Sequence, residues 1–225
     1  MFPLQDEFVS GRRFSNGHRC QIQYRGPLLA RNAYLSEEVS GLTVLHVGFA
    51  DHLELIQEKR QSGTWLHDVL RESAKVCIGY DVNTDAVRRA ADLGVAEVYS
   101  SLEQVPRLHF DLLLLPDVIE HLPNVQATLE GLSRDVSFSE ILVTTPNAFR
   151  LRNRLYMSEE VVNSDHRYWF SPVTLARTLV SSGYRNVQVG FTEGSRRRQR
   201  LARVRPLLAD GLIARATPPM LGSFS

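Results

Sequence analysis

Short runs of β-branched and aliphatic residues alternate with longer amphipathic stretches along most of the chain. This alternation predicts strand–helix–strand units around a parallel sheet, because the strands of such a sheet are covered on both faces and are apolar almost throughout. The strands that we expect are residues 43–48, 76–80, 96–99, 110–115, 141–145, 187–191 and 212–216. The last two fit an antiparallel closing pair. The pattern therefore predicts a Rossmann-like α/β fold with about seven strands, a mostly parallel sheet and helices on both faces.

The amphipathic stretches between these runs predict the helices. The helices that we expect cover residues 27–38, 53–74, 84–93 and 172–182. The first could lie over the carboxyl edge of the sheet, and the second is interrupted near Ser62 and Gly63. We therefore divide the chain into an N-terminal arm with one helix, residues 1–40, and a single domain, residues 41–218.

The composition is that of an ordinary globular domain. The 225 residues are 43% hydrophobic and 23% charged, with 26 Lys and Arg against 25 Asp and Glu. A chain of this size can close a core without disulfides or a structural metal. The two cysteines, Cys20 and Cys77, are too few for a disulfide or zinc framework, and we expect Cys77 to be a buried thiol in its apolar run.

The net charge of +1 gives no overall field that would attract nucleic acid or an anionic membrane. The N-terminus lacks the pattern of a signal peptide, and no window reaches about 18 consecutive apolar residues. We therefore expect a cytoplasmic protein with a small-molecule substrate and no nucleic-acid partner. The arginine-rich residues 196–205 predict a solvated helix face, or a contact with an anionic substrate or a membrane surface.

The residues just after each strand are the candidates for a site, because ligands bind beyond the carboxyl ends of the strands in an open parallel sheet. Gly48 follows the first expected strand, and a glycine there lets the backbone approach a ligand closely. Asp81 follows the second, where a carboxylate can accept hydrogen bonds from both hydroxyls of a ribose. The alternative for Asp81 is the N-cap of the next helix.

Five motifs at these strand ends and before the late helix carry a family resemblance. They are V-L-H-V-G at 44–48, G-Y-D at 79–81, D-V-I-E-H-L at 117–122, V-T-T-P-N at 143–147 and D-H-R-Y-W-F-S-P at 165–172. Over residues 41–191 the chain resembles the class I S-adenosylmethionine-dependent methyltransferases, and D-V-I-E-H-L after an apolar strand is the most specific motif. The resemblance implies S-adenosylmethionine as the cofactor.

The cofactor contacts follow from this resemblance residue by residue. Asp81 would bind the ribose, Val82 would lie against the adenine, and Pro116 would lie near the sulfonium. The full set that the resemblance implies for cofactor binding is Gly48, Phe49, Ala50, His52, Asp81, Val82, Ser101, Leu102 and Pro116.

The first loop departs from the family pattern. His46 stands where the family carries an acidic residue, and Ala50 and His52 stand where it carries glycines, so side chains enter the space expected for the cofactor. The distance of 33 residues from Gly48 to Asp81 also exceeds the about 20 of a dinucleotide fingerprint. This spacing argues against a nicotinamide enzyme.

Methyl transfer is an in-line displacement, in which the protein positions the acceptor, excludes water and accepts a proton. Histidine is the natural base. The catalytic candidates are Asp117, which the resemblance implies near the sulfonium, His121, which follows the same strand, and His166, which opens the segment expected to cap the site. The alternative for both histidines is a hydrogen bond to the backbone. Asp117, Glu120 and His121 are also similar to a metal-binding set of some methyltransferases, but Glu120 suits the start of a helix and we expect no metal.

Residues 147–170 form a connection too long and too polar for a simple turn, and we expect a lid over the acceptor. The alternatives are a solvated amphipathic helix over residues 148–157 and core positions for the aromatic side chains. The candidates for substrate binding in this segment are Asn147, Arg150, Tyr168 and Trp169.

Three functions compete on this basis. The leading one is O-methylation of a small molecule, and the aromatic content of 8% favours a sugar or a glycolipid or polysaccharide intermediate over a phenol. A non-catalytic, methyltransferase-like binding or scaffold protein is the alternative that the missing glycines favour. RNA modification is the weakest, because the basic residues cluster in one late stretch.

Overall fold

The computed structural model describes residues 1–3, 7–20, 22, 28–50, 52–151, 153, 165–192 and 208–220. Within these residues the chain forms one mixed sheet of eight strands. The strands are β1 (Phe2–Pro3), β2 (Thr43–Val47), β3 (Val76–Tyr80), β4 (Val98–Tyr99), β5 (His109–Pro116), β6 (Ser137–Pro146), β7 (Arg185–Thr192) and β8 (Gly211–Thr217).

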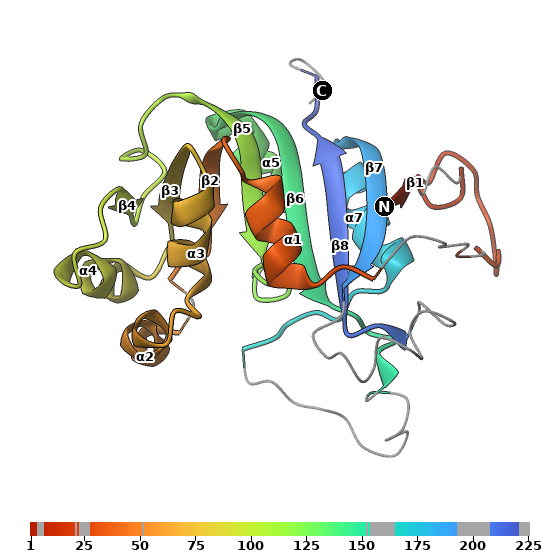
Figure 1. Ribbon diagram of the computed structural model, residues 1–225. Helices are drawn as coiled ribbons and strands as arrows, with labels where there is room; N and C mark the ends of the chain where they lie inside the picture. The colour runs from red at the N-terminus through yellow and green to blue at the C-terminus, as the bar shows by residue number, and fades with distance from the viewer. Residues whose placement is uncertain are drawn as a thin grey trace.

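The order of the strands is β1-β7-β8-β6-β5-β2-β3-β4 (Figure 1). The five strands from β6 to β4 pair in parallel, and β8 lies antiparallel between β6 and β7. The predicted Rossmann-like α/β class and the antiparallel closing pair are confirmed. The sheet has one strand more than the predicted seven, because β1 pairs antiparallel with β7 at the edge and two residues carry no detectable alternation.

The described helices lie in the connections between these strands. They are α1 (Arg31–Glu38), the 3₁₀ turn η1 (Leu53–Leu55), α2 (Ile56–Gln61), α3 (Leu66–Ser73), α4 (Thr84–Asp92), α5 (Val125–Asp135) and α7 (Pro172–Ser181). The predicted break between α2 and α3 is confirmed, and Gly63 there has a φ of +65°. Local chemistry fixes the helix starts: Asn83 caps α4, and Ser171 forms a capping box with Thr174 at the start of α7.

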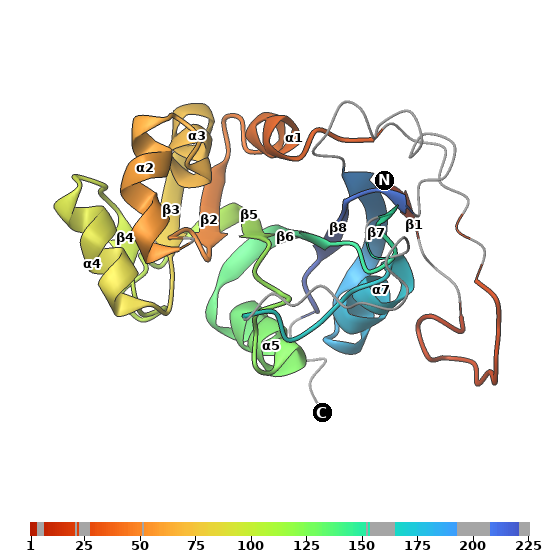
Figure 2. The ribbon, with the colours of Figure 1, turned by 90° about the horizontal axis from the view of Figure 1, so that it is seen from below.

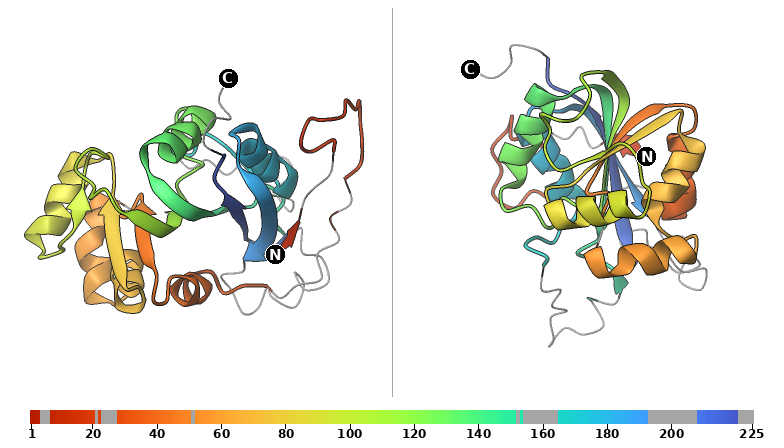
Figure 3. Two further views of the ribbon diagram at one scale, coloured as in Figure 1. Left: turned by 90° about the horizontal axis from the view of Figure 1, so that it is seen from above. Right: turned by 90° about the vertical axis from the view of Figure 1, so that its left-hand side faces the viewer.

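Helices cover both faces of the sheet, with α1 and α3 on one side and α5 and α7 on the other (Figures 2 and 3). Successive residues of a strand point to opposite faces, so neighbours on β5 enter different parts of the core. Leu113 packs in the cluster with Leu129 of α5, whereas Leu114 packs in the cluster with Leu35 of α1. Both β5 leucines are fully buried, and each such burial contributes roughly 1.5–3 kcal/mol.

The N-terminal helix lies on a face of the sheet rather than over its carboxyl edge, which corrects the expected placement. It begins at Arg31, and its apolar side chains Leu35 and Val39 pack in the same buried cluster as Val44 of β2. Burying these side chains requires a sheet face, because the edge offers only strand ends and loops. Only the start of the helix, at Arg31 and Asn32, reaches the carboxyl ends of the strands.

Some predicted features lie outside the described residues. They are the arginine-rich residues 196–205 and most of the helix proposed for residues 148–157. Among the residues that the structure describes, no helix is both long enough and apolar enough to cross a membrane.

Candidate active site

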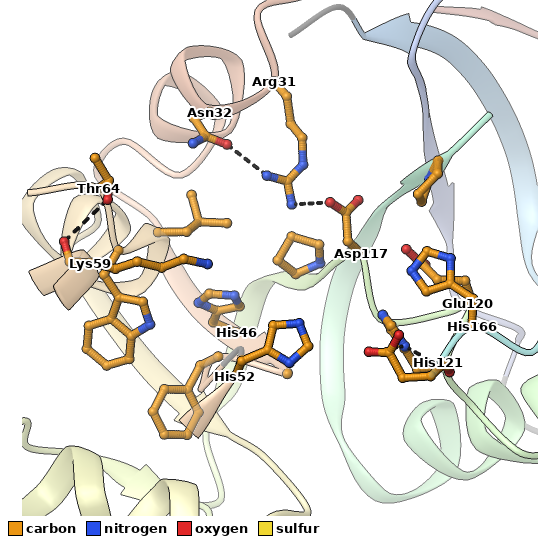
Figure 4. Close-up of a pocket in the computed structure, with 17 residues that line it drawn as sticks. Arg31, Asn32, His46, His52, Lys59, Thr64, Asp117, Glu120, His121 and His166 are labelled. Carbon is orange, nitrogen blue, oxygen red and sulfur yellow. Dashed lines mark hydrogen bonds and ion pairs between the residues drawn. The ribbon is translucent and has the colours of Figure 1, made fainter. Parts of the chain in front are cut away.

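A cavity of about 870 Å³ opens where the carboxyl ends of β2, β5 and β6 meet the start of α1. In Figure 4, His46 and His52 lie on one side of it, Glu120, His121 and His166 on the other, and Arg31 and Asp117 between them. The cavity brings together many of the residues predicted for a site. Those that line it are Gly48, Phe49, His52, Pro116, Asp117, His121 and His166.

Gly48 follows β2 in a backbone conformation that only glycine adopts without strain, with a φ of +72°. A Cβ at this position would clash with the Cγ2 atom of Val118. The Gly48 N–H donates a hydrogen bond of 2.7 Å to the carbonyl of Tyr80. The loop after β2 is therefore tied to the end of β3 and packs directly against the turn after β5.

Asp81 lies at the tip of β3 and joins two backbone segments. Its Oδ2 atom accepts a hydrogen bond of 3.3 Å from the N–H of Ala50, and its Oδ1 atom accepts one of 2.9 Å from the N–H of Asn83. Burial raises the pKa of Asp81, and these two backbone donors oppose the shift. The N-cap of α4 is Asn83, so the alternative reading of Asp81 as the cap is wrong.

The residues predicted to surround an adenine lie next to Asp81, beyond the lining of the cavity. Val82 is 78% exposed, an unusual state for a large apolar side chain. Ser101 and Leu102 follow β4, and the N–H of Asp81 donates a hydrogen bond of 3.1 Å to the carbonyl of Tyr99 in that strand. The ends of β3 and β4 thus form one continuous edge.

Asp117 follows β5 at the centre of the sheet and has a φ of +52°. Its N–H donates a hydrogen bond of 2.9 Å to the carbonyl of Thr144, and its Oδ1 atom accepts one of 2.8 Å from the hydroxyl of the same residue. Its Oδ2 atom forms an ion pair of 2.8 Å with Arg31. The sequence analysis did not identify Arg31, which brings a guanidinium from α1 into the cavity.

Glu120 is a buried acid that faces the cavity, with 1% of its surface exposed. Burial, followed by the negative charge of Asp117, raises the pKa of Glu120 to about 8. The hydroxyl of Thr145 opposes this shift, but no described residue donates a hydrogen bond of ordinary geometry to either carboxylate oxygen. The expected place at a helix start is wrong, because α5 begins only at Val125 and Glu120 lies in the preceding turn.

His121 and His166 meet edge to face, with ring centroids 4.7 Å apart. The Nδ1 atom of His121 lies 3.2 Å from the carbonyl oxygen of Asp165 and 3.4 Å from its Oδ2 atom. Burial, followed by the charge of His121, lowers the pKa of His166. A neutral His166 imidazole can accept a proton at neutral pH.

The segment that carries His166 is pinned to the turn that carries Glu120. The carbonyl of Glu120 accepts backbone hydrogen bonds from Arg167, at 2.8 Å, and from Tyr168, at 3.2 Å. Donor atoms of Glu120, His121 and His166 lie within 4.8 Å of one another, and such a set could hold a divalent cation. The set predicted from the sequence differs, because it included Asp117, whose carboxylate pairs with Arg31 instead.

The four residues proposed for substrate binding lie outside the lining of the cavity. Asn147 is fully buried, where its side chain donates to the carbonyl of Ala209 and accepts from the N–H of Phe149. The hydroxyl of Tyr168 donates a hydrogen bond of 3.2 Å to the carbonyl of Pro123, and Arg150 stacks over the ring of Trp169. These contacts hold the loop, and the geometry gives Asn147 a structural role.

The chain is similar to known proteins in sequence and in fold. The family model described as "Methyltransferase domain" matches residues 60–189. A search of curated proteins gives no significant match. Three solved structures share the fold. A SAM-dependent methyltransferase from Archaeoglobus fulgidus is 18% identical, with a TM-score of 0.53 over 83% of this chain and 92% of that chain.

The second is the magnesium protoporphyrin IX methyltransferase from Synechocystis PCC 6803, solved with bound SAH. It is 16% identical, with a TM-score of 0.52 over 84% of this chain and 80% of that chain. The third is the small RNA methyltransferase HEN1, which is 21% identical, with a TM-score of 0.60 over 92% of this chain and 27% of that chain. These identities establish a shared fold, and the second and third proteins are named for acceptors of different kinds, a porphyrin and a small RNA.

Proposed function

Because the chain belongs to the methyltransferase domain family, as a class I S-adenosylmethionine-dependent methyltransferase, we propose that it methylates a hydroxyl group of a small polar molecule. A sugar, or a glycolipid or polysaccharide intermediate, is the acceptor class that we favour. The observation that carries this proposal is the alignment of Gly48, Asp81 and Asp117 at the ends of three neighbouring parallel strands, β2, β3 and β5.

The proposed cofactor position runs along these strand ends. Each Asp81 carboxylate oxygen accepts one backbone N–H and keeps a lone pair for a ribose hydroxyl. The exposed Val82 offers an apolar surface for the adenine. At the other end, Gly48 leaves room for the methionine part, and Arg31 can pair with its carboxylate through two parallel N–H donors.

The polar lining of the cavity supports a hydroxylated acceptor. Apart from imidazoles, only Phe49 and Trp65 contribute aromatic rings among the described lining residues, whereas arginine, lysine, carboxylate and imidazole groups surround the rest. A flat apolar phenol would leave the buried Glu120 carboxyl group without a partner, at a cost of roughly 1–3 kcal/mol. A molecule with several hydroxyls can provide that partner.

His166 acts as the base in this proposal. Its imidazole is neutral at neutral pH and faces the cavity, so it can take the proton from the acceptor hydroxyl as the oxygen attacks the methyl carbon. His121 packs against it and is itself held by Asp165. The bound cofactor supplies the activated methyl group and leaves as a neutral thioether.

A labelled-methyl transfer assay tests the acceptor class. The purified chain is incubated with methyl-labelled S-adenosylmethionine and, separately, with free sugars, a glycolipid extract, simple phenols and short RNA. We expect label on hydroxyls of the sugars or glycolipids, and transfer reduced by about 10²–10⁴-fold in His166→Ala. His109→Ala is the matched control, because His109 lies at the amino end of β5. Label only on RNA or only on phenols would contradict the proposal.

One observation favours the second candidate, a binding protein without catalysis. Ala50 is fully buried and gives its N–H to Asp81, in a loop where the family pattern carries glycines. This candidate predicts that the chain binds S-adenosylmethionine or the acceptor but transfers no label to any acceptor in the assay.

A further inference from the structure

Three buried side chains with metal-binding atoms meet beneath the loop that follows β2. His46 comes from β2, Cys77 from β3 and His67 from α3, and their exposed fractions are 1%, 5% and 0%. The Nδ1 atoms of the two histidines lie 3.1 Å apart, and the Cys77 Sγ atom lies 3.9 Å from Nδ1 of His67. One donor atom from each residue lies within 4.8 Å of the other two.

These separations fit the edges of a tetrahedral zinc site. Zinc binds imidazole nitrogen at about 2.0–2.1 Å and thiolate sulfur at about 2.3 Å, so tetrahedral angles place two nitrogens about 3.3 Å apart and nitrogen and sulfur about 3.6 Å apart. We propose that His46, His67 and Cys77 bind one zinc ion. Because His46 also lines the cavity, the fourth coordination position faces the cavity and takes water.

The fold holds these donors in place without a ligand from a loop. Val44 pairs with Cys77 across β2 and β3, and His46 lies two residues further along β2, so both donors point from one sheet face toward α3. The rings of Phe49 and Trp65 lie 4.8 Å and 5.3 Å from the ring of His67. These two rings cover the His67 side of the site.

Zinc binding displaces one proton from the site. The Cys77 thiol releases its proton to solvent, and the thiolate forms the bond to zinc while both imidazoles bind as neutral ligands. Burial raises the pKa of the Cys77 thiol to about 12, and the positive charge of Arg71 opposes that shift. The ion would tie α3 to β2 and β3, and this role does not depend on the proposed methyl transfer.

Zinc titration of the reduced, metal-free full chain against a chromophoric chelator tests the site. We expect the wild type to bind one equivalent of zinc tightly. In Cys77→Ala and in His67→Gln the affinity for zinc should fall by more than about 100-fold, which exceeds the effect of losing a residue that only supports a metal ligand. Cys20→Ala is the matched control and binds as the wild type does. His166→Ala also keeps the zinc, because it belongs to the other cluster of donors.

Cobalt substitution supplies a second readout that does not depend on affinity. Bound Co²⁺ should give a thiolate charge-transfer absorption in the wild type and in Cys20→Ala, and Cys77→Ala should lack it. Circular dichroism melting identifies any variant that fails to fold, and in that case the charge-transfer band of Cys20→Ala, whose one remaining cysteine is Cys77, is decisive. The proposal is contradicted if the wild type binds no zinc, or if a folded Cys77→Ala binds zinc as the wild type does. The two histidines would then form a hydrogen-bonded pair without a metal.

Discussion

Burial shifts the pKa values of two neighbouring groups in opposite directions and leaves both neutral at neutral pH. Glu120 is protonated because its pKa rises to about 8, and His166 is unprotonated because its pKa falls below 6.5. A neutral acid can donate a hydrogen bond, whereas a neutral imidazole can accept a proton. Such opposed shifts in adjacent groups are typical of acid–base sites.

Glu120→Gln tests the buried acid through stability. Between pH 4.5 and about 8 the folded state holds a proton on Glu120 that the unfolded state has lost, so the free energy of unfolding falls as pH rises. Glutamine has no such proton. We expect the stability of Glu120→Gln relative to wild type to increase by up to about 1.4 kcal/mol per pH unit across this window, measured by urea unfolding.

An exposed glutamate provides the control for that series. Glu103→Gln removes a carboxylate near the surface and measures the general effect of losing one negative charge. A difference between Glu120→Gln and wild type that stays constant from pH 5 to 8 would mean that Glu120 is ionised in the folded protein.

The pH dependence of the reaction tests His166. Because the pKa of His166 lies below its ordinary value of 6.5, kcat/KM should rise with pH through the acidic range, with the midpoint of the rise below pH 6.5. His166→Ala should lose this limb, measured by initial rates of methyl transfer with an identified acceptor. If the variant keeps the acidic limb, another group is the base.

The sequence predicts those site residues that directly follow a strand of the parallel sheet. Gly48, Asp81 and Asp117 each follow a strand, and the carboxyl ends of parallel strands meet at one edge. Arg31 and the burial of Glu120 could not be predicted in this way. Arg31 enters from a helix whose packing depends on the whole sheet, and the burial of Glu120 depends on the segment near residue 167 that covers its turn.

The loop after β2 has no room for one added carbon atom at Gly48. Gly48→Ala adds a Cβ that clashes with Val118 in a backbone of φ +72°. Gly63→Ala is the matched control, because Gly63 has a φ of +65° and nothing within 4 Å of the added atom. We expect Gly63→Ala to cost about 1–2 kcal/mol of stability and Gly48→Ala about 1–3 kcal/mol more, measured by denaturant unfolding.

A second substitution separates the clash from the backbone strain. Gly48→Ala combined with Val118→Ala removes the contact and keeps the φ angle, so the added loss should shrink relative to Val118→Ala alone. Equal destabilisation by Gly48→Ala and Gly63→Ala would mean that the turn after β5 does not pack against Gly48.

Long apolar strands and the helices α4 and α7 were predicted well because their signals are local, whereas the capped helix α5 was missed. The position of β5 follows from its four consecutive leucines, Leu112–Leu115, and α7 follows from Ser171 and Pro172 at its start. The strand β1 and the placement of α1 were not predicted, because a two-residue strand and a short helix acquire their structure from the sheet that they pack against.

At the scale of the whole molecule, α1 connects the N-terminal segment to the cofactor site through Arg31. We expect Arg31→Met to weaken the binding of S-adenosylhomocysteine by about tenfold or more, because a charge-assisted pair with the methionine carboxylate is lost. Methylthioadenosine lacks that carboxylate and should bind wild type and variant equally in calorimetric titrations. Arg88→Met, an exposed position on α4, is the control. Equal losses for both ligands would place Arg31 in a purely structural role.

The account's central claim is that the ribose of the cofactor binds Asp81 at the carboxyl ends of the parallel strands. Calorimetric titration of S-adenosylhomocysteine into wild type, Asp81→Asn and Asp85→Asn measures this directly, with the exposed Asp85 on α4 as the control. The predicted result is one equivalent bound with equal affinity by wild type and Asp85→Asn, and an affinity lower by about 10–150-fold in Asp81→Asn. No binding to the wild type at millimolar ligand, or equal affinity in all three proteins, would contradict it.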